Sequence, residues 1–118
     1  MKHSKKRTNK KAITAIFRSP NMDPRIRYYD SLAEIHARLG SVPLCLTEID
    51  SNMYVITRAD AKKNGEPRNM YHSVTNGMVS YTRDFHGDVV MIGYNPKDEK
   101  VTSLTKAQIR RIMNAPRG

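Results

Sequence analysis

The chain has 118 residues, of which 38% are hydrophobic, and this length suits one domain with a modest core. No apolar run approaches the ~20 residues of a membrane-spanning helix, and no apolar stretch follows the basic N-terminus, so neither a membrane protein nor a secreted one is expected. The lone cysteine, Cys45, cannot form an internal disulfide, which favours a cytoplasmic protein. Lysine and arginine number 21 against 11 acidic residues, and the net charge of +10 favours a polyanionic partner.

Much of the positive charge lies in the first eleven residues, which contain six cations and no acidic residue. This segment has no aliphatic side chain after Met1, so it cannot bury enough apolar surface to offset the entropy cost of ordering it. We therefore expect a flexible basic arm over residues 1–11 and a single domain over residues 12–115. The cations of the arm are Lys2, Lys5, Lys6, Arg7, Lys10 and Lys11.

Short apolar runs predict the first two strands of the domain. Residues 12–17 place Ile13, Ala15 and Phe17 on one face of a strand, because side chains alternate between the two faces. Residues 25–29 alternate polar and apolar side chains, which is typical of a partly exposed strand. A cluster of turn residues with two prolines separates the two runs.

Two helices are predicted, over residues 31–39 and 105–114. Gly40 ends the first helix, since glycine adopts the left-handed conformation at little cost. Each helix begins with a capping box, in which a Ser or Thr side chain and a Glu or Gln three residues later accept hydrogen bonds from backbone N–H groups. The capping pairs are Ser31 with Glu34 and Thr105 with Gln108.

Two hairpins are predicted in the middle of the chain. Residues 44–49 and 53–57 flank a short polar turn and form the first. Residues 71–75 and 78–82 flank Asn76-Gly77, a strong signal for a tight hairpin turn, and form the second.

The most apolar run of the chain is Val89-Val90-Met91-Ile92, which has no helical period and is bounded by Gly87 and by Asn95-Pro96. A short run of this kind predicts a strand that is buried on both faces. The other elements must cover it or leave it in water. The fold class expected is therefore α+β, a small and mostly antiparallel sheet with two helices.

The order of these parts, with several short motifs, resembles a family of small proteins of phages, plasmids and other mobile elements, known only as a domain of unknown function. The resemblance covers Ile13 to Met113 and implies an accessory role in a mobile element, including inhibition of a host defence system of the anti-CRISPR type. It implies no catalytic residue. Members often carry Gly-Gly where this chain has Gly40-Ser41. The matching positions are Leu32, Leu39-Gly40, Asn69, Gly87 to Gly93 and Thr102 to Thr105.

One constellation could carry catalysis or a metal ion. Asp84, His86 and Asp88 place three titratable groups within five residues. The same residues are typical of a solvated turn, with Gly87 supplying a positive φ, and we favour the turn. The sequence has no Gly-rich phosphate loop, no Cys-x-x-Cys and no His-Glu-x-x-His motif. We therefore expect no enzyme activity, no metal, no cofactor and no small-molecule substrate.

Nucleic acid, alone or in a nucleoprotein, is the partner that the charge favours, since clustered cations suffice to neutralise phosphates. Tyr28 and Tyr29 lie beside two arginines and are candidate rings for base stacking. The competing interpretation is that the arm only aids solubility and that the tyrosines are ordinary sheet residues. The candidate cations are Lys5, Lys6, Arg7, Lys10 and Lys11 in the arm, and Arg25, Arg27, Arg110 and Arg111 in the body.

The alternative function is a protein–protein inhibitor or adaptor without nucleic-acid contact. Tyrosine and methionine are enriched at interfaces, and Tyr71, Met78 and Tyr81 lie in the predicted second hairpin. The partner would be a protein such as a host defence nuclease. The two functions overlap, because a blocker of an RNA-guided nuclease could use both the arm and the hairpin.

Overall fold

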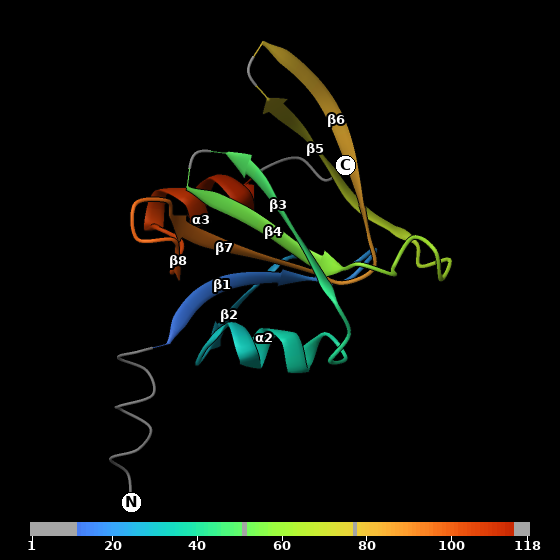
Figure 1. Ribbon diagram of the computed structural model, residues 1–118, viewed down its shortest axis with the longest axis horizontal. Coiled ribbons are helices and arrows are strands. Elements are labelled where there is room, and N and C mark those ends of the chain that lie inside the picture. The colour runs from blue at the N-terminus through green and yellow to red at the C-terminus, as the bar shows by residue number, and fades with distance from the viewer. Residues whose placement is uncertain (1–11, 51, 77, 115–118) are drawn as a thin grey trace, which may run out of the picture.

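The apolar run near the C-terminus forms a strand, β7, in the middle of the main sheet (Figure 1). The computed structural model describes residues 12–50, 52–76 and 78–114. In chain order its elements are β1 (Ile13–Arg18), β2 (Arg25–Tyr29), α2 (Leu32–Arg38), β3 (Leu44–Asp50), β4 (Met53–Arg58), β5 (Arg68–Asn76), β6 (Val79–His86), β7 (Val89–Asn95), β8 (Lys100–Thr102) and α3 (Lys106–Asn114).

The main sheet has the strand order β2-β1-β7-β4-β3, and all its paired strands are antiparallel. One edge of β7 pairs with β4. The other edge is shared, because β1 pairs with the first half of β7 at Val89 to Met91 and β8 pairs with the second half at Gly93 to Asn95. The first strand and the last strand of the chain therefore lie along the same edge of the central strand.

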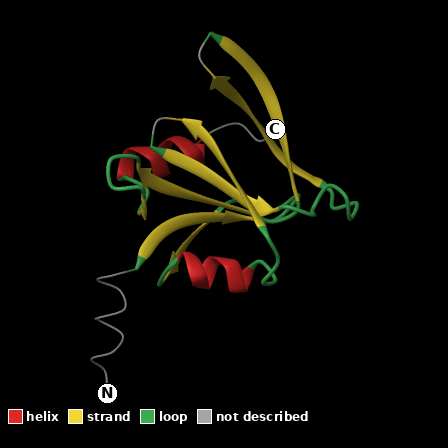
Figure 2. Cartoon of the chain, in the orientation of Figure 1, coloured by secondary structure: helices red, strands yellow, loops and turns green. Residues whose placement is uncertain are grey.

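The two helices cover opposite faces of this sheet, as Figure 2 shows. Val90 and Ile92 of β7 are buried in the cluster beneath α2, and Val89 and Met91 are buried in the cluster on the face of α3. The prediction that this strand is buried on both faces is confirmed. The α+β class with a mostly antiparallel sheet and two helices is confirmed as well.

Local signals account for the helix ends. The Oγ atom of Ser31 accepts a hydrogen bond from the N–H of Glu34 at 3.2 Å, although the carboxylate of Glu34 accepts from the N–H of Asp30 rather than from that of Ser31. Gly40 follows α2 with a φ of 100°. In α3 both bonds of the predicted capping box form, between Thr105 and Gln108, at 2.8 and 3.1 Å.

The second hairpin, β5–β6, forms a two-stranded sheet of its own and rises away from the main sheet (Figure 1). Met70 and Phe85 anchor its base in the cluster on the face of α3. Its strands are longer than predicted, and Asn76 pairs with Val79. Two of the residues assigned to a turn, Asp84 and His86, therefore lie in β6, so the turn interpretation is wrong for them. Gly87 does follow with a φ of 72°.

The predicted basic arm and residue 115, the last of the predicted domain, lie outside the described residues, so those boundaries remain predictions. Neither helix in the described part of the chain has the length and apolar character needed to cross a membrane.

Candidate nucleic-acid interface

The three candidate catalytic residues have separate partners. Asp84 lies 3.8 Å from a guanidinium nitrogen of Arg68, across the hairpin. The Nδ1 atom of His86 lies 3.0 Å from the backbone oxygen of Glu66. Asp88 accepts a hydrogen bond from the hydroxyl of Ser19 at 2.8 Å, beside the end of β1. Within the described ranges no group of three His, Cys, Asp or Glu side chains is placed to hold a metal ion.

The two candidate stacking tyrosines point in opposite directions. Tyr29 is 4% exposed and belongs to the cluster beneath α2, where loss of hydration raises the pKa of its phenol. It cannot receive a base without unpacking the core, so this part of the stacking hypothesis is wrong. Tyr28 is 63% exposed, since it lies on the other face of the edge strand β2.

The two arginines of β2 lie on the face of Tyr29, not on that of Tyr28. Arg25 pairs with Phe17 across β1 and β2, and Phe17 packs against the cluster beneath α2. The guanidinium of Arg27 lies over the ring of Phe17 at 4.6 Å, a cation–π contact that holds it against the body. The sequence neighbours from Arg25 to Tyr29 therefore do not form one binding surface.

The remaining candidate cations lie elsewhere. Arg110 and Arg111 are exposed residues of α3. The candidate cations of the N-terminal segment are outside the described residues; these are Lys5, Lys6, Arg7, Lys10 and Lys11.

Hydrogen bonds and strand pairing fix the position of Thr14, near the start of the described chain. Leu104 donates its backbone N–H to the oxygen of Thr14 at 2.9 Å, and Thr14 donates to the hydroxyl of Ser103 at 2.8 Å. On its other side Thr14 pairs with Tyr28 of β2. Thr14, near the start of the described chain, thus lies between Tyr28 of β2 and the residues that follow β8.

Sheet pairing also brings together two tyrosines that the sequence analysis did not single out. Tyr54 of β4 and Tyr94 of β7 have ring centroids 4.6 Å apart, with an interplanar angle of 48°. Both are half-buried. Loss of hydration and the nearby carboxylate of Glu48 raise the pKa of the Tyr54 phenol. The sequence does not predict this contact, because the two tyrosines are far apart along the chain and no local pattern shows that β4 and β7 are neighbours.

A cavity of about 350 Å³ lies between β8 and the start of α3. Its lining has hydroxyl and amide groups but no carboxylate, imidazole or amine, so it offers hydrogen bonds without acid–base chemistry. Gly93 lies in this region, and a Cβ atom there would approach the backbone oxygen of Ser103 to 2.5 Å. The lining residues are Asn52, Tyr94, Asn95, Thr102, Ser103, Thr105 and Gln108.

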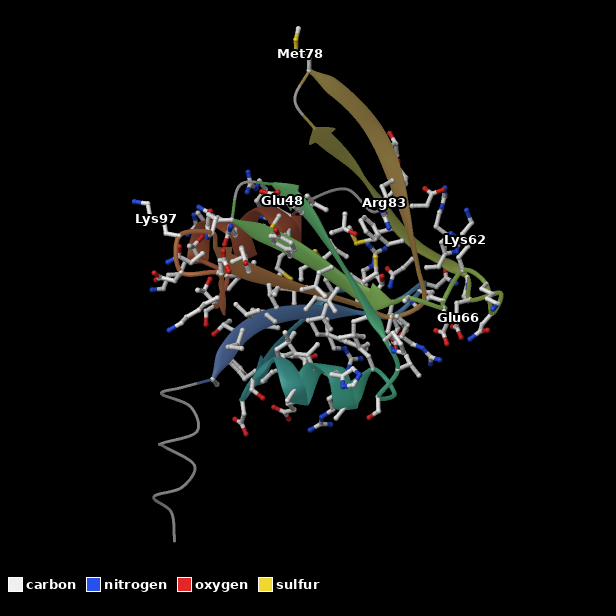
Figure 3. All side chains as sticks on the ribbon, in the orientation of Figure 1. Glu48, Lys62, Glu66, Met78, Arg83 and Lys97 are labelled. Atoms are coloured by element: carbon white, nitrogen blue, oxygen red, sulfur yellow. The ribbon has the colours of Figure 1, made fainter. Side chains whose placement is uncertain are left out.

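The hairpin β5–β6 presents two of the three candidate interface residues. Met78 is fully exposed and stands at the end of the hairpin, far from the main sheet (Figure 3). Tyr71 is 47% exposed, with the guanidinium of Arg68 5.4 Å from its ring centroid. The side chain of Tyr81 lies outside what the structure describes.

Sheet order, helix placement and the projecting hairpin together define a small α+β protein. Residues 13–116 match the family described as Domain of unknown function (DUF3846), and the chain belongs to this family. Comparisons with curated proteins and with solved structures find no match.

Proposed function

We propose that this protein binds nucleic acid, free or within a nucleoprotein, through residues 1–11 and the adjoining end of the body. It acts in the cytoplasm without enzymatic activity, as an accessory protein of a phage or other mobile element. By occupying nucleic acid it inhibits a host defence complex, such as an RNA-guided nuclease, in the manner of an anti-CRISPR protein. The observation that carries the proposal is the junction of the six-cation segment with the body beside exposed Tyr28.

The physical basis is phosphate neutralisation. Each lysine or arginine that meets a phosphate releases condensed counterions, so binding becomes strongly dependent on salt but indifferent to sequence. The cations of residues 1–11 have no acidic neighbour within the segment to compete for them. Tyr28 is opposite Thr14 across β1 and β2, and Thr14 follows residues 1–11 closely along the chain. The exposed ring of Tyr28 adds a surface on which a base can stack.

Deleting residues 1–11 is expected to weaken binding and to flatten its salt dependence. If all six cations contact duplex phosphates, the slope of log K against log salt is about −5, at ~0.9 per contact. Binding is measured with labelled single-stranded and double-stranded oligonucleotides at several salt concentrations. A chain of full length with the six cations replaced by serine separates charge from length. Equal binding by all three proteins would contradict the proposal.

A protein–protein inhibitor is the second candidate, and the projecting hairpin favours it. Residues 69–82 contain no Asp, Glu, Lys or Arg, in a chain where these types make up 27% of residues. Natural proteins commonly protect exposed strand edges with charges, prolines or bulges, and the register of this hairpin is regular from Met70 to Asn76. A regular, uncharged edge of this kind can accept a strand or side chains of a partner.

For this candidate, Met78→Asp is expected to abolish a protein complex that survives nuclease treatment, because it places a charge at the centre of an apolar contact. The measurement is recovery of the host protein with the tagged chain after nuclease digestion. Met22→Asp is the matched control, since Met22 is 47% exposed and lies in the loop between β1 and β2. Loss of the complex in both variants, or in neither, argues against the hairpin as the interface.

A further inference from the structure

We infer that the outer edge of β6 pairs with the same edge of a second copy of this chain, so that two β5–β6 hairpins form one four-stranded antiparallel sheet. The surface is the backbone edge of residues 79–86, and the two copies are related by a two-fold axis. The inference goes beyond the proposed function, because it concerns how two copies associate and requires no nucleic acid.

The outer edge of β6 is open to another strand. In the described part of the chain β6 pairs with β5 and with no other strand, and β5 is the only element that it contacts extensively. By contrast, β5 also lies against β3, and Met70 and Ile49 of these two strands share a buried cluster. The projecting hairpin therefore presents the backbone N–H and C=O groups on the outer side of β6 for pairing (Figure 1).

The hairpin has fewer strands than a stable sheet needs. A two-stranded sheet is only marginally stable in water, and three or more strands are usually required. Burial of Met70 and Phe85 supports the base of the hairpin. Above this base the two strands continue to Asn76 and Val79 as a sheet separate from the main one. Pairing through β6 gives this projecting part the further strands that it lacks.

The upper hairpin is also the part of the chain at which two copies repel each other least. The net charge of +10 makes two copies repel wherever their charged surfaces meet. Residues 69–82 form the longest run of the sequence without Asp, Glu, Lys or Arg. Natural edge strands commonly carry charges or prolines that prevent pairing, and residues 79–82 contain neither. A second copy offers the same uncharged edge in return.

The charged residues at the base of the hairpin have partners within their own copy. A guanidinium nitrogen of Arg68 lies 3.8 Å from a carboxylate oxygen of Asp84, across the hairpin. The guanidinium of Arg83 lies 5.7 Å from the ring centroid of Phe85, and its Nη2 group donates to the Sγ atom of Cys45 at 3.6 Å. Pairing of the β6 edges therefore leaves each of these charges with the partner that it already has.

Antiparallel pairing keeps the two charged bodies apart. β6 runs from the end of the hairpin toward the main sheet, so the main sheets of the two copies lie at opposite ends of the shared sheet. Eight residues of strand span about 27 Å, at ~3.4 Å each, whereas exposed charges are screened beyond about 8–10 Å at physiological salt. Met78, fully exposed at the end of the hairpin, then lies beside the base of the other hairpin (Figure 3).

Sedimentation equilibrium of the full chain tests the inference, after nuclease digestion and a wash in high salt. The mass is expected to rise with protein concentration from 13.5 kDa and to level off at about 27 kDa, twice the mass of one chain. The same rise is expected in high salt, in which binding to phosphates fades. A mass that stays at that of one chain overturns the inference and leaves the proposed function untouched. A doubling that nuclease treatment removes also overturns it, because nucleic acid then bridges the copies.

Charges placed on one strand or the other identify the paired edge. Ser80→Lys/Thr82→Lys brings lysines of the two copies together on neighbouring strands, and like charges at such positions destabilise pairing. Association is expected to weaken about tenfold. The matched control is Ser73→Lys/Thr75→Lys, because these residues are opposite Thr82 and Ser80 on β5. Its lysines in the two copies are three strand spacings, about 14 Å, apart, so association stays within about twofold. Equal weakening by both variants contradicts the β6 edge.

Hydrogen exchange locates the interface without any substitution. Alternate amides of an edge strand point away from their sheet and exchange readily with solvent. Amides of β6 are expected to become protected as the protein concentration rises, whereas those of β2, an edge strand of the main sheet, keep their exchange rates. Protection that rises equally in both strands, or in neither, overturns the inference. A mass that keeps growing with concentration also overturns it, because a two-fold pair is closed.

Discussion

Val90→Asp is expected to unfold the domain. Val90 is 1% exposed in the central strand, with α2 and its cluster on one side and β1 and β4 along the two edges. An unpaired carboxylate there costs several kcal/mol, against a total stability of about 5–15 kcal/mol for a small domain. The measurement is circular dichroism and denaturant unfolding of the purified variant, with loss of the cooperative transition as the expected result.

Two variants calibrate this effect. Ile26→Asp introduces the same side chain at a 42% exposed position of the edge strand β2 and is expected to leave the fold intact. Thr105→Ala removes the cap of α3 and is expected to cost about 1 kcal/mol. A Val90→Asp protein that unfolds as cooperatively as these two would show that the central strand is not buried as described.

Asn69→Ala is expected to produce the second large loss, roughly 2–4 kcal/mol. Asn69 is 4% exposed, and its Nδ2 group donates to the backbone oxygens of Arg18 and Gly87 at 2.7 and 2.8 Å. These two bonds tie the start of the hairpin to the end of β1 and to the turn before β7. Alanine leaves both carbonyl groups without this donor, and a buried acceptor without a partner loses its hydration with no compensation.

Chemical denaturation at constant protein concentration measures this loss as a shift in the unfolding midpoint. Asn114→Ala, at an exposed position near the end of α3, is the matched control and is expected to change stability by less than about 0.5 kcal/mol. Equal midpoints for the two variants would show that the side-chain bonds of Asn69 contribute nothing measurable.

The elements that could be predicted from the sequence are those whose causes are local. A capping box acts over three residues, so Thr105 and Gln108 identify the start of α3 without reference to the rest of the chain. The apolar run from Val89 to Ile92 likewise predicts burial on both faces by its composition alone. What covers each face depends on partners far away in sequence, and the order β2-β1-β7-β4-β3 has no local signal.

In the candidate site, too, local sequence predicts less than the contacts with distant parts of the chain decide. Tyr28 and Tyr29 are adjacent and chemically alike, and only the placement of α2 over one face decides that Tyr29 is buried and Tyr28 exposed. Asp84 and His86 are typical of a turn in composition, yet pairing with β5 extends the strand through both of them. The contact between Tyr54 and Tyr94 arises from the β4–β7 pairing. These strands are far apart in the sequence, so no periodic pattern of side chains predicts that they are neighbours.

The position of β7 also dictates when this protein can fold during its synthesis. The pairs β1–β2 and β3–β4 are complete once the first half of the chain has left the ribosome, but an isolated hairpin is at best marginally stable in water. They have no common partner until β7 follows, and β8 must then close the same edge beside β1, through bonds such as that between Leu104 and Thr14. A nascent chain stalled before Val89 is therefore expected to be sensitive to protease along most of its length, and protection should appear abruptly with the last quarter of the sequence.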